Sequence, residues 1–180
     1  MNTSTVAIVV LALALGTGVT PPIAAAAGGE DKSVVTVAFG VGLNTALPPP
    51  NGEPNHHILP GIIKVKAGGV VNFVVSGLHQ VYVYNPGVTR EDLIVPLSGF
   101  FVNSHDGPIA PGAAYYRGIV PAGGPLGLPS ISGPRSNADN RVEAVSFKEP
   151  GIYLVICNVR PHLLDGMYAY IKVLAPDEDE

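Results

Sequence analysis

The sequence is poor in charge, in cysteine and in methionine. Charged residues account for 13% of the 180 positions and the formal net charge is −4, with no cluster of Lys or Arg. Proteins that bind nucleic acid carry a basic patch, so this class is excluded. The single cysteine, Cys157, excludes a disulfide framework within the chain. Only two methionines occur, so the chain lacks the Met clusters that proteins delivering soft metal ions usually expose.

Glycine, proline and apolar residues are abundant instead. The chain has 22 Gly and 18 Pro, and 47% of its residues are hydrophobic. Short apolar runs between Gly/Pro turns are typical of an all-β domain. We therefore expect a Greek-key β-sandwich of about seven to nine strands. The expected strands are residues 33–40, 62–66, 70–75, 79–84, 141–147, 152–157 and 167–174, with shorter ones at 93–95, 100–102 and 114–120.

The N-terminal residues are typical of an export signal. Residues 1–29 carry no charged side chain, residues 6–19 form an apolar run, and the alanines at 24–27 offer cleavage sites. We predict a signal peptide over residues 1–27 and a single domain over residues 28–180, and hence a periplasmic or other extracytoplasmic location. Because no Lys or Arg precedes the apolar run, an uncleaved membrane anchor is the alternative.

A long connection interrupts the predicted domain at about residues 85–140. This segment is rich in Pro and Gly and shows little periodicity. Long irregular connections in compact domains usually have a function or cover part of the fold. We expect it to wrap the sandwich or to shape a partner surface.

A stretch near the C-terminus gathers side chains suited to a soft metal ion. Cys157 ends an apolar run, His162 follows it by five residues and Met167 by ten. Thiolate, imidazole and thioether groups suit copper better than Mg or Ca. Because strand side chains alternate between faces, Cys157 shares the face of Val155, and Met167 shares that of Ala169. Both sulfur atoms are therefore predicted to point into the core.

The same stretch resembles the C-terminal ligand loop of the cupredoxins, the blue copper proteins. The family's Phe-x-x-x-Gly-x-Tyr-x-x-x-Cys approach is matched by Phe147, Gly151, Tyr153 and Cys157. Its Cys-x4-His-x4-Met loop is matched by Cys157, His162 and Met167, with a spacing longer than in plastocyanins and similar to that of rusticyanin.

An earlier segment is similar to the family's first ligand strand. Residues 68–73, Gly-Gly-Val-Val-Asn-Phe, precede His79-Gln80-Val81, where the family has Gly-Asp-x-Val-x-Phe and then His-Asn-Val. By alternation His79 shares the inward face of Val81. Gln80 stands where the family has an Asn whose side chain ties the ligand loops together.

The resemblance implies a cofactor, a site and a function. The cofactor is one type 1 copper ion, and its ligands are His79, Cys157, His162 and Met167. Such a site leaves no open position, so the chain is expected to be a single-electron carrier that neither acts as an enzyme nor binds a small-molecule substrate. Its partner would be a cytochrome, an oxidase or a reductase that docks near His162, on an apolar patch of Pro161, Leu163, Leu164 and Met167.

Other functions remain open at this point. The chain is also compatible with a copper-binding accessory, storage or delivery subunit of a larger oxidase or reductase, with a domain of a nitrite-reductase assembly, and with a copper-free structural module. The single cysteine excludes a dinuclear copper centre, which needs two bridging thiolates. Membrane association is expected only if the N-terminal segment is retained.

The other histidines and one arginine also have interpretations that involve no metal ion. His56 and His57 lie in a Pro/Asn-rich loop, and we expect solvated side chains there rather than an accessory metal site. His105 is predicted to be a turn residue. Arg160 lies between two predicted ligands, and its charge would either raise the reduction potential or simply face solvent.

Overall fold

The computed structural model describes residues 33–40, 56–104, 110–116, 118, 125–126 and 140–178. The predicted signal peptide over residues 1–27, its cleavage and His105 lie outside these residues. Among the described residues, no helix has the length and apolar character needed to cross a membrane.

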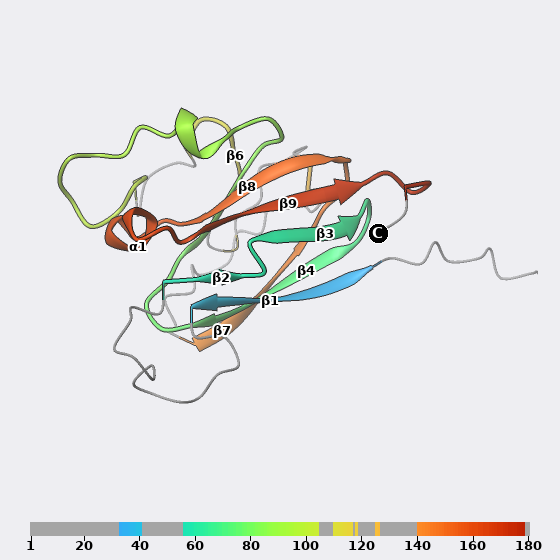
Figure 1. The fold of residues 1–180 in the computed structure, drawn as a ribbon, viewed down its shortest axis with the longest axis horizontal. Coiled ribbons are helices and arrows are strands. Elements are labelled where there is room, and N and C mark those ends of the chain that lie inside the picture. Colours follow the sequence, from blue (N-terminus) through green and yellow to red (C-terminus); the bar gives the residue numbers. More distant parts are fainter. Residues whose placement is uncertain are drawn as a thin grey trace, which may run out of the picture. The chain divides into compact units, whose positions relative to one another are not determined.

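The first sheet has four strands in the order β2-β1-β4-β7 (Figure 1). Strand β1 runs parallel to β4, whereas β2 and β7 pair in antiparallel fashion with β1 and β4. Strands β1 and β4, and likewise β4 and β7, are neighbours in the sheet but not in the sequence, because the chain crosses to the second sheet between them. The strands are β1 (Val34–Gly40), β2 (Ile58–Leu59), β4 (Val70–Ser76) and β7 (Asn140–Ser146).

The second sheet has five strands in the order β3-β9-β8-β5-β6. Strands β3 and β9 are parallel, and the other pairs are antiparallel. Between β8 and β9 the chain forms a short helix, α1 (Arg160–Leu164). The strands are β3 (Ile62–Lys66), β5 (Val81–Tyr84), β6 (Ala113–Tyr116), β8 (Gly151–Cys157) and β9 (Tyr168–Leu174).

The main core lies between the two sheets. Alternate residues of β4, Val71, Phe73 and Val75, are buried against inward-facing residues of the second sheet such as Val155 and Ile171. This alternation is the reason that β4 is half-buried while its other face stays accessible. The predicted all-β sandwich is confirmed.

A second cluster covers the outer face of the five-stranded sheet. Tyr82, Tyr116, Leu154 and Ile156 point away from the main core, yet they are buried. Val88, Leu93, Val95 and Val102, from the predicted long connection, pack on this face. The prediction that this segment wraps the sandwich is confirmed for its described part, which explains why every residue of β5 and β6 is buried.

Several predicted strand boundaries were wrong. Residues 93–95 form no strand, and residues 100–102 contribute only an isolated bridge between Phe101 and Val159. His79 precedes β5 instead of lying within it. The loop expected between Cys157 and Met167 contains helix α1, where Pro161 occupies the first turn, a position that proline tolerates because its missing N–H has no helical partner there.

Candidate metal centre

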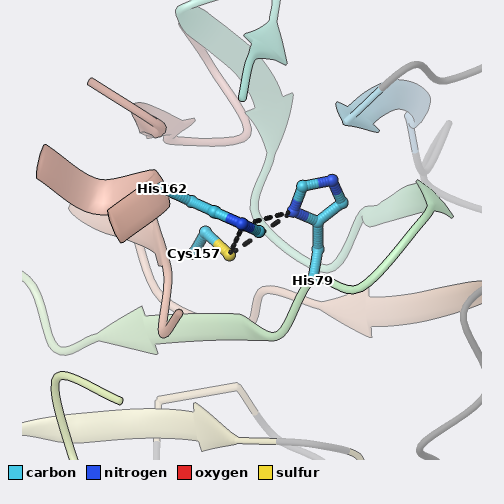
Figure 2. Close-up of side chains that lie close together, drawn as sticks. All are labelled: His79, Cys157 and His162. Atoms are coloured by element: carbon cyan, nitrogen blue, oxygen red, sulfur yellow. Dashed lines mark hydrogen bonds between the residues drawn. The ribbon is translucent and has the colours of Figure 1, made fainter. Parts of the chain in front are cut away.

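Three of the predicted ligands converge at one end of the second sheet. The Cys157 Sγ atom lies 3.7 Å from His79 Nδ1 and 3.6 Å from His162 Nδ1. The two Nδ1 atoms are 2.9 Å apart. Figure 2 shows the three side chains pointing toward one another, with His162 coming from α1. All three donor atoms lie within 4.8 Å of one another, a separation that one metal ion can bridge.

Strand pairing brings the first two donors together. Val81 is paired with Cys157 in the ladder between β5 and β8, so His79, just before Val81, is held beside the cysteine. Both Cys157 and His79 are buried, with 0% and 6% of their surfaces exposed. The predicted inward orientation of these side chains is confirmed.

A tight turn at the end of α1 supplies the third donor. Gly166 has a φ of 93°, in the left-handed region that glycine adopts at low cost. Its N–H donates to Leu163 O, and the Met167 N–H donates to His162 O. These hydrogen bonds close the helix after little more than one turn and hold His162, which is half-buried, over the cysteine.

The two imidazoles have the protonation state that metal binding requires. Burial, assisted by the neighbouring His162, lowers the pKa of His79 to about 3. Burial and the neighbouring His56 lower the pKa of His162 to about 4, although Asp165 opposes this. Both imidazoles are therefore neutral near pH 7, which is the form that binds metals. Burial raises the pKa of the Cys157 thiol to about 11, so this group needs a bound cation to lose its proton.

Met167 lies where the chain returns to the core. It is fully buried among the core residues of β9, as predicted. Its carbonyl accepts a hydrogen bond from the Cys157 N–H, 3.0 Å away. The backbone thus keeps the methionine next to the cysteine, and its role as an axial ligand stays a prediction.

A buried amide network ties the two ligand segments together. The Asn158 side chain donates to Gln80 Oε1 at 3.1 Å, and the Asn158 N–H donates to the Gln80 carbonyl at 2.9 Å. Asn158 Oδ1 also accepts from the N–H of Asn103 at 2.9 Å, and Asn103 donates to the Tyr84 hydroxyl at 2.7 Å. Gln80 therefore still links the ligand loops, through Asn158. No periodic pattern in the sequence pointed to Asn158 or Asn103.

A buried ion pair supports His79 from the other sheet. The Arg141 side chain donates to the His79 carbonyl at 3.0 Å and, through Nε, to Glu143 at 2.6 Å. The Tyr115 hydroxyl donates to the second Glu143 oxygen at 2.5 Å. Because β7 and β6 belong to different sheets, this network joins the two layers beside the site. The positive charge of Arg141 also favours the thiolate of Cys157 and lowers its pKa, against the larger effect of burial.

Gly40 leaves room for the imidazole of His79. A Cβ atom on this glycine would lie 2.6 Å from His79 Nε2 and 2.4 Å from the Ser76 carbonyl oxygen. The backbone φ of Gly40 is 92°. Its N–H donates to His57 O at 2.8 Å, and this bond places the segment that contains His56 next to the metal centre.

His56 contacts the site, contrary to the expectation of a solvated side chain. Its ring stacks on the His162 ring, with 3.7 Å between the centroids and 21° between the planes. Its Nδ1 atom lies 2.5 Å from Asp165 Oδ2. His57 is exposed, as expected. The sequence could not reveal this contact, because the residues that separate His56 from Asp165 cross both sheets.

Two expectations about the surroundings of His162 need correction. Leu163 is only 1% exposed and packs in the second core cluster, because it points inward from α1, and Met167 is buried in the main core. Of the expected apolar patch, only Pro161 and Leu164 are exposed. Arg160 does not simply face solvent. Its side chain donates to the carbonyls of Pro96 at 2.6 Å and Leu97 at 2.9 Å and so holds the loop before β6 beside α1.

The chemistry of this donor set fits copper. A buried thiol and two neutral imidazoles form a compact trigonal group, in which the soft sulfur favours Cu(I) and the imidazoles suit both oxidation states. No carboxylate belongs to the group among the described residues, so hard cations such as Mg or Ca are poorly matched.

Comparisons with known proteins give structural likeness at low identity. No family model and no curated protein matches the chain. A pseudoazurin from Sinorhizobium meliltoi is 17% identical, with 80% of this chain and 76% of that chain covered and a TM-score of 0.40. A reduced auracyanin from Roseiflexus castenholzii is 13% identical, with 78% and 96% covered and a TM-score of 0.41. A Cu-containing nitrite reductase from Thermus scotoductus is 16% identical, with 79% and 22% covered and a TM-score of 0.35.

Identities of 17% or less with TM-scores near 0.4 do not by themselves assign the chain to a family. The similarity of the ligand spacing to rusticyanin stays a prediction. Taken with the β-sandwich and the three convergent donors, the ligand motifs make the chain similar to the cupredoxins.

Proposed function

We propose that the protein binds one type 1 copper ion and carries single electrons between redox partners. The observation that carries this proposal is the triangle of donor atoms formed by His79, Cys157 and His162. Copper held by such a set supplies a one-electron couple between Cu(I) and Cu(II). The protein's part is to hold the donors in an arrangement that changes little between the two oxidation states.

The supports around the donors favour electron transfer over substrate chemistry. Asn158 ties the His79 and Cys157 segments together, and Arg141 fixes the His79 backbone. A rigid set of ligands lowers the rearrangement that accompanies each electron. With Met167 as a fourth donor, no position would be open to a substrate. We therefore propose a carrier and not an enzyme.

The partner is proposed to dock beside α1. His162 is half-buried there, and Leu164 and Leu97 are 53% and 97% exposed on the neighbouring surface. Apolar residues around a partly exposed ligand suit brief contacts with a redox protein. Export through the segment over residues 1–27 would place this exchange outside the cytoplasm.

An accessory or delivery subunit is the second candidate. Its storage form is favoured by one observation, the burial of Cys157, which suits retention of copper. A delivery protein has to release its ion, so its copper would pass rapidly to a chelator. A carrier would retain it through repeated oxidation and reduction.

The deciding experiment is an optical and EPR spectrum of residues 28–180 after addition of one equivalent of Cu(II). Cys157→Ala is the control. An intense thiolate-to-copper band with a narrow hyperfine splitting, absent from the control, is the expected result. Stoichiometric binding without that band would favour the accessory subunit. Failure to bind copper would overturn both functions.

A further inference from the structure

We propose that His56, held by Asp165, is a positioning residue that fixes the imidazole of His162 in its metal-binding orientation. This inference rests on the proposed role of His162 as a ligand. Neither His56 nor Asp165 belongs to the donor group itself.

The first contact is the stack between the two rings. Their centroids are 3.7 Å apart and their planes differ by 21°. A stacked neighbour restricts rotation of His162 about its side-chain bonds, because tilting the ring would separate the two faces or drive them into overlap. The near-parallel geometry also means that His56 covers a face of His162 and does not compete for the ion at its Nδ1 edge.

The second contact fastens His56 to the helix that carries His162. His56 Nδ1 donates to Asp165 Oδ2 at 2.5 Å, since an ionised carboxylate only accepts. Asp165 is the C-terminal cap of α1, and its own N–H donates to Pro161 O at 3.0 Å. The side chains of His56 and Asp165 are 22% and 44% exposed, so the bond is partly shielded from water.

The third element is the anchoring of the segment that presents His56. Two residues after it, Ile58 and Leu59 pair with β1, and the Gly40 N–H donates to His57 O at 2.8 Å. His56 therefore reaches α1 from the four-stranded sheet, whereas α1 leaves the five-stranded sheet. A ligand on a helix of only five residues needs such support, because so short a helix is not stable alone.

Comparison of His56→Ala, His56→Phe and Asp165→Ala tests this role. The phenylalanine keeps an aromatic face but loses the hydrogen bond, and Asp165→Ala loses the tether but keeps both rings. His57→Ala is the matched control. The His57 side chain is exposed, and only its backbone carbonyl, which the variant keeps, bonds to Gly40. The variants are made in the chain over residues 28–180.

The first readout needs no metal. In the metal-free protein, the stacked ring displaces the NMR resonances of the His162 ring protons by its ring current. We expect this displacement to be lost in His56→Ala, retained in His56→Phe and unchanged in His57→Ala. The second readout is the rate at which a Cu(I) chelator removes copper. We expect it to rise about tenfold in His56→Ala, in the range found for residues that orient metal ligands, and less in His56→Phe and Asp165→Ala.

Identical His162 resonances and copper-release rates in wild type, His56→Ala and His57→Ala would overturn the inference. If wild type binds no copper, the proposed function fails, and the metal-free resonances still decide whether His56 positions His162. A failure of the proposed copper function is thus distinguished from a failure of the role inferred for His56.

Discussion

The side-chain amide of Asn158 donates a 3.1 Å hydrogen bond to the side-chain oxygen of Gln80. Each of these residues directly follows a proposed metal ligand in the sequence, Cys157 or His79. Both are buried, with 0% and 5% of their surfaces exposed. The bond therefore couples the two ligand segments inside the protein, where a lost hydrogen bond is not replaced by water.

Replacement of Asn158 tests this coupling. In Asn158→Ala, the buried Gln80 side chain loses this hydrogen bond and the part-buried Asn103 N–H loses its bond to Asn158 Oδ1, so we expect the free energy of unfolding to fall by about 2–3 kcal/mol. Urea denaturation of the metal-free protein measures this. In the copper-loaded protein we expect a broadened, shifted thiolate-to-copper band. Unchanged stability and spectrum would show that the network is dispensable.

Replacement of Gly40 tests the space around His79. A methyl group there would meet His79 Nε2 at 2.6 Å, and alanine would also be strained at a φ of 92°. We expect Gly40→Ala to weaken copper binding by at least about tenfold, measured by competition with a chelator.

Gly87→Ala is the matched control for this variant. Gly87 has a φ of 90°, but a Cβ atom added to it would meet nothing within 4 Å. Gly87→Ala therefore introduces the same backbone strain as Gly40→Ala but no steric clash, and its copper affinity should equal that of wild type. Equal loss of affinity in both variants would contradict the role assigned to Gly40.

A double-mutant cycle tests the ion pair of Arg141 and Glu143. Their side chains are only 10% and 7% exposed, so removal of either partner takes from the other a countercharge that water replaces poorly. We expect Arg141→Met to lower the free energy of unfolding by about 3–5 kcal/mol. Arg141→Met combined with Glu143→Leu should cost clearly less than the sum of the single changes. Strictly additive costs in urea denaturation would contradict the pairing.

The pKa of His79 predicts a loss of stability in acid. The unfolded chain binds a proton at this histidine below its ordinary value of 6.5, whereas the folded chain binds it only near pH 3. Between these values the unfolded state holds more protons, so the stability of the metal-free protein should fall as the pH decreases from about 6.5.

Urea denaturation between pH 7.5 and 4.5 measures this dependence. The titration of carboxyl groups also makes the stability depend on pH. Because His79→Gln keeps every other titrating group, subtracting its pH dependence from that of wild type removes their contribution. The slope should be smaller in His79→Gln and unchanged in His57→Gln, which alters an exposed histidine. Equal slopes in wild type and His79→Gln would refute the predicted shift.

Charge placed near α1 tests the docking surface. Leu164→Lys puts a cation beside His162, so two copies of the protein should repel at this face. We expect electron self-exchange to slow at least about tenfold at low ionic strength and to recover partly with added salt. Ile152→Lys is the control, because Ile152 is similarly exposed, 55% against 53% for Leu164, but lies at the far end of β8 from Cys157.

The Leu164→Lys result has to be read with the optical spectrum. An unchanged spectrum with a slowed exchange would locate electron exit at α1. Equal exchange rates for Leu164→Lys and Ile152→Lys would place it elsewhere. Leu163 is unsuitable for this test, since it is buried and a lysine there would destabilise the fold.

Local patterns in the sequence were sufficient to predict most of the strands and many of the side chains that face the core. Strand alternation depends only on neighbouring residues, so the inward orientation of Cys157 in β8 could be predicted from a short stretch. His79 and Met167 lie just outside β5 and β9, and the same alternation continued beyond the strand ends agrees with their burial. That Cys157 and His162 lie close together could be predicted for the same reason, because His162 follows Cys157 by only five residues in the sequence.

The tertiary structure alone decided what surrounds the ligands. Gln80 meets Asn158, Arg141 meets the His79 carbonyl, and His56 meets Asp165. These pairs are 62 to 109 residues apart in the chain. No periodic pattern encodes them, because each pair depends on the order of the strands in two sheets and on where the chain crosses between them.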